Sequence, residues 1–218
     1  MSSDRARTFF DGYAGDFDAI YNRRSSFGSR VVNHIFRRSM QLRYLKTLEG
    51  CHPIEGKTVL DVGCGPGHYS ISLAQRGAAH VVGIDFAGGM LRLATEHARQ
   101  AGVAGRCEFR EADFLTFISE PFDYLILMGF MDYIPEPGRV IEKVLSLTRS
   151  KAFLSFPVEG GFIAWQRRLR YRKRCDLFLY TRSRLEELFS LPSGIEARIE
   201  SIRQDFFVTV SVSPNSNR

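Results

Sequence analysis

Residues 59–70 are Val-Leu-Asp-Val-Gly-Cys-Gly-Pro-Gly-His-Tyr-Ser, a short apolar run with a carboxylate followed by closely spaced glycines. The glycines are Gly63, Gly65 and Gly67, and they come directly after Asp61 and Val62. Glycine is needed where the backbone turns sharply or a ligand approaches it closely. A strand that ends in such a turn and leads into a helix is typical of a nucleotide-type site at the carboxyl edge of a parallel sheet.

The spacing of these glycines distinguishes between nucleotide-like ligands. The dinucleotide fingerprint is Gly-x-Gly-x-x-Gly, and here its third glycine position is occupied by His68. No Gly-Lys-Ser/Thr follows, so a Walker loop is not predicted. The carboxylate of Asp61 would repel a pyrophosphate but suits a ligand with an ammonium group and no phosphates, such as S-adenosylmethionine. An NAD(P)-binding oxidoreductase remains a remote alternative.

Strand-like and helix-like segments alternate after residue 57, which predicts crossover units and a parallel sheet covered on both faces. The last two segments are adjacent strand-like runs joined by a tight turn, which predicts an antiparallel pair. Thr181 is expected to cap the helix that precedes them. In order, we expect strands at 58–61, 80–85, 107–110, 122–128, 151–156, 195–202 and 206–212, and helices at 68–76, 88–100, 137–147 and 181–190.

The ends of the chain have a different character from this alternating region. Residues 4–48 show apolar side chains at three- and four-residue spacing, which predicts two helices. We therefore expect an N-terminal helical cap at 1–50 and a main domain at 51–213. Within the main domain, about 157–180 forms a basic insertion, and residues 214–218 are expected to fray.

The segment at 59–70 resembles the first motif of the class I S-adenosylmethionine-dependent methyltransferases. The layout of the whole chain is nearest to the small-molecule methyltransferases of ubiquinone and menaquinone biosynthesis. The resemblance implies an α/β, Rossmann-like, doubly wound and mostly parallel sheet of seven strands, with helices on both faces, an N-terminal helical cap and a C-terminal antiparallel hairpin. It also implies direct in-line transfer of a methyl group from S-adenosylmethionine to an O, N or C nucleophile of a small molecule, leaving S-adenosylhomocysteine and using no metal.

The resemblance assigns the cofactor to the carboxyl ends of the first four strands. Asp61 faces the amino group, Asp85 accepts the ribose hydroxyls and Asp113 accepts the adenine amine, although each carboxylate could instead be a turn or cap residue. Apolar side chains sandwich the adenine, and backbone at the fourth strand end lies near the transferring methyl group. The expected cofactor residues are Asp61, Gly63, Cys64, Gly65, Pro66, Gly67, Asp85, Phe86, Met90, Asp113, Phe114, Met128, Gly129 and Tyr21.

The acceptor side of the site is less clear from the sequence. Asp132 and Tyr133 occupy a segment that often carries histidines in the ubiquinone and menaquinone relatives. They could orient a hydroxyl or amine acceptor, or be a solvated acid beside a packed tyrosine. Tyr13, with Tyr21, lies on the expected N-terminal helix, where it could close over the site or pack within the helix pair. These three residues, Asp132, Tyr133 and Tyr13, are the catalytic candidates.

A single segment carries the basic charge of the chain. The net charge is +6, and the six basic residues within 165–174 account for all of it. Arg167, Arg168 and Arg170 would suit a carboxylate or phosphate on the acceptor, so the substrate could be anionic. A solvated helix face, a membrane surface and an RNA or other nucleic-acid methyltransferase are the alternatives for this segment.

The remaining composition excludes several classes of protein. No run of about 18 apolar residues predicts a membrane span, and the N-terminus lacks an apolar signal core. The four cysteines form no Cys-x-x-Cys pair, which opposes a zinc site or a disulfide framework. We therefore expect a cytoplasmic protein, and the sequence leaves its oligomeric state open.

Overall fold

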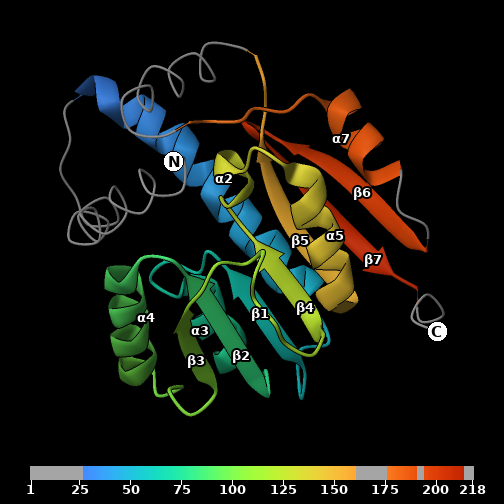
Figure 1. Ribbon diagram of the computed structural model, residues 1–218. Helices are drawn as coiled ribbons and strands as arrows, with labels where there is room; N and C mark the ends of the chain where they lie inside the picture. Colours follow the sequence, from blue (N-terminus) through green and yellow to red (C-terminus); the bar gives the residue numbers. More distant parts are fainter. Residues whose placement is uncertain (1–26, 161–175, 191–193, 214–218) are drawn as a thin grey trace.

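The computed structural model describes residues 27–160, 176–190 and 194–213, with side chains from residue 38 onward. A mixed sheet of seven strands forms its centre, in the order β3-β2-β1-β4-β5-β7-β6 (Figure 1). All strands run in one direction except β7, which is antiparallel to both of its neighbours. The strands are β1 (Thr58–Val62), β2 (His80–Asp85), β3 (Cys107–Glu111), β4 (Phe122–Leu127), β5 (Thr148–Pro157), β6 (Ile195–Ile202) and β7 (Asp205–Val212).

Helices cover both faces of this sheet. In Figure 1 the helices α2 and α3 lie behind the sheet, whereas α5 and α7 lie in front of it. The described helices are α2 (Phe27–Gly50), α3 (His68–Gln75), α4 (Gly88–Gln100), the short 3-10 helix η1 (Met131–Tyr133), α5 (Pro137–Leu147) and α7 (Arg182–Ser190). Among these, none is long and apolar enough to cross a membrane.

The structure confirms the predicted doubly wound, mostly parallel sheet and its C-terminal antiparallel hairpin. Strand β5 begins earlier than the predicted strand at 151–156, and Thr181 does cap α7, because its hydroxyl accepts the Arg184 N–H at 3.2 Å. The predicted helix near the N-terminus, and most of the predicted insertion at 157–180, lie outside the described residues. The domain boundaries therefore stay a prediction.

The two faces of the sheet bury separate apolar clusters. The cluster on the α5 side combines the centre of the sheet with α5, α7 and the segment after β3. The cluster on the α2 side has Phe153 at its centre, with ring centroids 6.5 Å from Tyr124 and 6.1 Å from Phe207. Gly50 ends α2 against the Phe153 ring, where a side chain would overlap it. Only glycine therefore fits at this crossing of helix and sheet.

The strand order places the candidate site at the carboxyl ends of the parallel strands. Strands β2 and β4 flank β1 on opposite sides, so the order of the strands reverses between β1 and β4. Asp61 pairs with Gly83 on β2, and Asp85 pairs with Glu111 on β3. Open α/β sheets bind ligands in the crevice at such a reversal. The predicted carboxylates thus come from neighbouring strands at this edge.

A carboxylate also fixes the opposite, amino edge of the sheet. Asp123 at the start of β4 accepts the Thr58 N–H at 2.9 Å and the Thr58 hydroxyl at 3.0 Å, and it pairs with Lys57. These bonds hold the first residues of β1 and β4 together. Asp123 is therefore a structural carboxylate that lies away from the candidate site.

We expect Phe153→Ala to lower the free energy of unfolding by about 3–5 kcal/mol, because it opens a cavity in the cluster on the α2 side. The matched control is Ile118→Ala, since the Ile118 side chain is 89% exposed and its loss should cost less than about 0.5 kcal/mol. Urea unfolding followed by circular dichroism measures both. Equal losses would show that Phe153 does not anchor this face.

Candidate functional site

The loop after β1 is a tight turn built from glycines. Gly63, Gly65 and Gly67 have φ values of 66°, 51° and 81°, a region that side chains rarely tolerate. The N–H groups of Gly63 and Cys64 both donate to the Ile84 carbonyl, at 2.8 and 3.1 Å. The loop is therefore anchored to β2, and nothing lies within 4 Å of the position that a Gly65 side chain would take. This leaves backbone open to a ligand.

Asp61 is a buried carboxylate at the end of β1 with only one of its oxygens in use. Its side chain is 2% exposed, and Oδ2 accepts both the Ser70 hydroxyl at 2.7 Å and the Ser70 N–H at 3.2 Å. Burial raises the pKa of Asp61 from 3.8 to about 6, although the bonds from Ser70 lower it. Within the described residues Oδ1 accepts no hydrogen bond. A positively charged group beside Oδ1 would relieve the burial cost.

Asp85 joins the glycine loop to the end of β2. Its Oδ2 accepts the Gly65 N–H at 2.9 Å, and its Oδ1 accepts the Ala87 N–H at 2.9 Å. A carboxylate oxygen can accept more than one hydrogen bond, so these two bonds do not by themselves exclude a ligand hydroxyl. The turn or cap interpretation and the ligand interpretation of Asp85 are therefore compatible.

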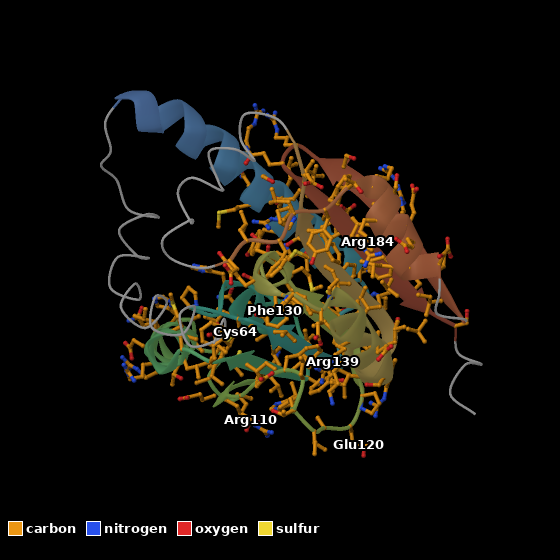
Figure 2. All side chains as sticks on the ribbon, turned by 45° about the horizontal axis from the view of Figure 1, so that its top comes forward. Cys64, Arg110, Glu120, Phe130, Arg139 and Arg184 are labelled. Carbon is orange, nitrogen blue, oxygen red and sulfur yellow. The ribbon has the colours of Figure 1, made fainter. Side chains whose placement is uncertain are left out.

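Asp113 differs from the other two carboxylates because it is exposed. Its Oδ1 accepts the Leu115 N–H at 2.8 Å, which closes the turn after β3. The next residue, Phe114, is buried and packs edge to face against Phe130, with 6.0 Å between ring centroids. Phe130 in turn covers Gly63, because a Cβ on that glycine would lie 3.1 Å from the ring. Figure 2 shows Phe130 close to Cys64 at the centre of the molecule.

Cys64 and Pro66 fill the loop rather than presenting reactive groups. Cys64 is buried, and desolvation raises the pKa of its thiol well above 9.0. Because the thiolate is the nucleophilic form, this environment opposes a covalent role. The Pro66 carbonyl accepts the Nδ1–H of His97 from α4, at 3.1 Å. On the same helix Met90 is buried, whereas Phe86 is half-buried at the end of β2.

The segment after β4 lies beside the glycine loop. Gly129 has a φ of 73°, and its N–H donates to the Ser155 hydroxyl at 2.8 Å. Met128 and Tyr133 are half-buried, and Asp132 is buried. The carbonyl of Asp132 accepts the Phe178 N–H at 2.9 Å, so the segment is tied to the last residues of the predicted insertion at about 157–180.

Tyr180, which lies just before α7, also supports the segment after β4. Its hydroxyl donates to the Met131 carbonyl at 3.3 Å. Burial, together with the nearby Asp132, raises the pKa of Tyr180 to about 12. Tyr180 therefore remains a neutral donor at physiological pH.

Five predicted site residues lie outside the described residues. These are Tyr13, Tyr21, Arg167, Arg168 and Arg170. The described part of the chain contains no group of three or more His, Cys, Asp or Glu side chains that could hold a metal ion. The structure brings together the predicted residues at the ends of β1, β2, β3 and β4.

Several residues at the site were not predicted. Ser70 fixes Asp61, His97 holds the loop carbonyl, and Phe130 covers the first glycine. Ser155, which accepts the Gly129 N–H, could have been noticed in the sequence because it is a polar residue among the apolar residues at the end of β5. The contacts of the others depend on tertiary packing.

Comparisons with known proteins agree with this geometry. A family model described as "Methyltransferase domain" matches residues 54–156. A ubiquinone biosynthesis O-methyltransferase from Coxiella burnetii (strain RSA 331 / Henzerling II) is 29% identical over 160 residues, which cover 73% of this chain and 63% of that protein. The protein of the same name from Ralstonia nicotianae is 36% identical over 114 residues, covering 51% of this chain and 47% of the relative.

Solved structures show the same fold. Magnesium protoporphyrin IX methyltransferase from Synechocystis PCC 6803, with bound SAH, superposes with a TM-score of 0.77 at 20% identity, covering 95% of this chain and 98% of that one. This chain thus shares the Rossmann-like fold of that structure. The part of the chain that matches the methyltransferase family model, residues 54–156, includes strands β1 to β4 and most of β5. The chain spans 63% of the length of the Coxiella relative.

The raised pKa of Asp61 predicts a pH-dependent gain in stability for Asp61→Asn. Ionising Asp61 costs no folding stability below about pH 4, a growing amount between pH 4 and 6, and a constant amount above. The shift from 3.8 to about 6 corresponds to about 3 kcal/mol. The amide oxygen of asparagine can accept both bonds from Ser70.

We therefore expect Asp61→Asn to unfold at higher urea concentration than the original protein at pH 8, and at a similar one at pH 4. Ser70→Ala is the matched control, because it removes the hydroxyl bond to Asp61 but keeps the backbone bond and the charge. It should lower stability at pH 8. If Asp61→Asn is less stable than the original protein at pH 8, then ionisation of Asp61 does not destabilise the fold as we expect.

Proposed function

We propose that this chain is an S-adenosylmethionine-dependent methyltransferase that transfers a methyl group to an O, N or C nucleophile of a small molecule. The observation that carries the proposal is the buried Asp61 carboxylate, whose Oδ1 accepts no hydrogen bond from the described residues, beside a loop of left-handed glycines. The matching family model and the ubiquinone-pathway relatives support it. The SAH in the Synechocystis structure supports the choice of cofactor.

The residues present fit this cofactor better than a dinucleotide. S-adenosylmethionine carries an ammonium group that suits Oδ1 of Asp61, whereas a pyrophosphate would be repelled there. The two carboxylate oxygens of Asp85, at the end of β2, would accept the vicinal ribose hydroxyls. Asp113 and Phe114 would bind the adenine, with Phe86 and Met90 on its apolar faces. His68 stands where the dinucleotide fingerprint has glycine, which makes an NAD(P)-dependent oxidoreductase the weaker candidate.

The bound cofactor supplies a methyl group that is already activated by the positive charge on sulfur. The protein therefore has to bind, orient and exclude water rather than create a strong nucleophile. Phe130 and Phe114 form an apolar wall beside the glycine loop. Such a wall favours loss of charge at the sulfur, because it keeps water away. A base is needed only if the acceptor must lose a proton.

The acceptor would lie beyond the end of β4. Among the described residues, Asp132 and Tyr133 are the candidates for orienting it. Tyr13 is a third candidate, which rests on the sequence alone. Arg167, Arg168 and Arg170 would bind an anionic group on the acceptor. An RNA or membrane target rests on the same basic segment, and no contact of a described residue favours it. A small molecule is therefore the substrate class that we propose. We also propose a cytoplasmic location.

Binding of S-adenosylhomocysteine tests the proposal directly. We expect isothermal titration calorimetry to show one site, and Asp85→Ala to weaken binding at least tenfold, because it removes acceptors for the ribose. The matched control is Asp123→Ala, which also removes a carboxylate that accepts a backbone N–H but lies at the amino edge of the sheet. It should bind normally. Absence of binding to the original protein would refute the proposed function.

The affinity should also depend on pH. Because only the ionised Asp61 attracts the ammonium group, we expect binding to weaken as pH falls below the pKa of about 6, approaching tenfold per pH unit. Titrations between pH 5 and 8 measure this dependence. In Asp61→Asn the affinity should be low and nearly independent of pH over that range. An unchanged pH profile in that variant would assign the dependence to another group.

A further inference from the structure

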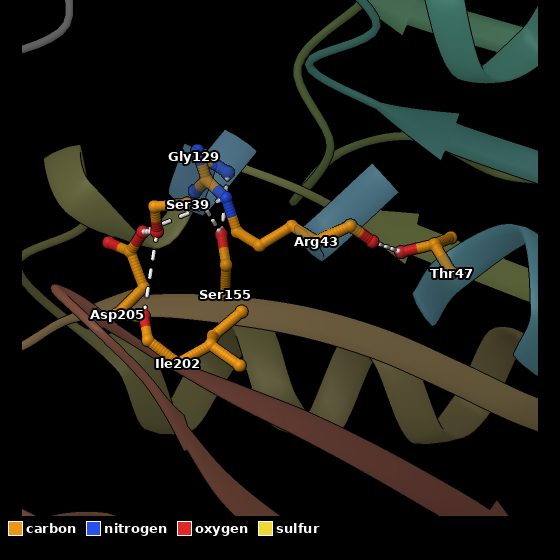
Figure 3. A network of polar contacts seen from close by, with 7 residues as sticks. All are labelled: Ser39, Arg43, Thr47, Gly129, Ser155, Ile202 and Asp205. Carbon is orange, nitrogen blue, oxygen red and sulfur yellow. Dashed lines mark hydrogen bonds and ion pairs between the residues drawn. The ribbon is translucent and has the colours of Figure 1, made fainter. Parts of the chain in front are cut away.

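A buried polar network joins helix α2 to the end of β4 (Figure 3). Arg43 on α2 donates from Nη1 to the Ser155 hydroxyl at 3.0 Å, and the Gly129 N–H donates to the same oxygen at 2.8 Å. Arg43 is 6% exposed and Ser155 is fully buried. Two donors from different elements therefore meet on one hydroxyl oxygen inside the protein.

A second branch of the network holds Arg43 in place. Asp205, at the start of β7, accepts the Ser39 hydroxyl at 2.7 Å and lies 3.7 Å from Nε of Arg43. Its neighbour in the turn, the Ile202 carbonyl, lies 3.5 Å from the same hydroxyl. Burying a guanidinium is costly unless it is paired and hydrogen-bonded. Arg43 is thus positioned by a carboxylate on one side and engages Ser155 on the other.

The network ends at the residue that turns the chain into the site. Gly129 has a φ of 73°, a left-handed conformation that turns the chain at the end of β4. The next residue, Phe130, packs on Gly63 of the glycine loop and on Phe114 after β3. A shift of Gly129 would therefore reach two of the strand ends that we assign to the cofactor.

We propose that Arg43 is a positioning residue, which sets Gly129 and Phe130 through Ser155 and so couples helix α2 to the cofactor loop. The inference rests on the proposed function, because it treats the loop as the cofactor site. Arg43 acts through Ser155, and we assign it no direct contact with the methyl donor or the methyl acceptor.

Three single variants separate this role from simple stabilisation. Ser155→Ala removes the shared oxygen, and Arg43→Met removes its donor while keeping an apolar stem. Ser39→Ala is the matched control, because it removes one hydroxyl bond of Asp205 from the same helix and leaves the Arg43–Asp205 ion pair and the bonds of Ser155 intact. All three lose buried hydrogen bonds and should unfold at lower temperature.

Only the first two should change the site. We expect calorimetry to show S-adenosylhomocysteine binding weakened about fivefold to tenfold in Ser155→Ala and Arg43→Met. The double variant should lose no more than the worse single variant, because both act on one pathway. Hydrogen exchange of the Gly129 amide, followed by NMR, should be faster in these variants and unchanged in Ser39→Ala.

Either of two results would overturn the inference. One is an affinity within twofold of the original protein in both Ser155→Ala and Arg43→Met. The other is an equal loss of affinity in Ser39→Ala, which would show a general effect of stability. Failure of the original protein to bind S-adenosylhomocysteine is a different result, since it refutes the proposed function itself. If Arg43→Met does not fold, Ser155→Ala against Ser39→Ala still decides the question.

Discussion

The need to satisfy polar groups at the carboxyl ends of buried parallel strands governs this structure. Where β1 and β2 end, the backbone has no further strand to bond with, and the side chains there are carboxylates. Asp85 accepts N–H groups from the glycine loop and from the start of α4, and Asp61 accepts the first turn of α3 through Ser70. The carboxylates that would bind a ligand are thus the ones that hold the loop in shape.

Because the same carboxylates serve both purposes, local contacts hold together the part of the site that we assign to the methyl donor. The glycines let the backbone turn without side chains, and the carboxylates satisfy the N–H groups that the turn leaves over. Phe130, which follows the neighbouring strand β4, packs against this loop at Gly63. Among the described residues, the segment after β4 is held instead by the Phe178 N–H and the Tyr180 hydroxyl, which donate to its main-chain carbonyls.

Much of the fold followed from local sequence patterns. The strand-helix alternation and the positions of Asp61, Asp85 and Asp113 predicted the parallel sheet and its functional edge, because each depends on residues close together in the chain. Arg43 and Ser155 could not be predicted in the same way, since the residues lie 112 positions apart and meet only after folding. The roles given to Tyr13, Tyr21 and the arginines at 167–170 stay predictions, because those residues lie outside the described part of the chain.

The electrostatic position of Asp61 has a practical consequence for finding ligands. Burial of the ionised Asp61, with one oxygen that no described residue bonds, leaves the ligand-free protein below its greatest stability above pH 6. Any small molecule that places a cation at Oδ1 is favoured by mass action on the folded state. Thermal-shift screening at pH 8 should therefore rank compounds by their ammonium groups first, and analogues that lack this group would be missed by that method.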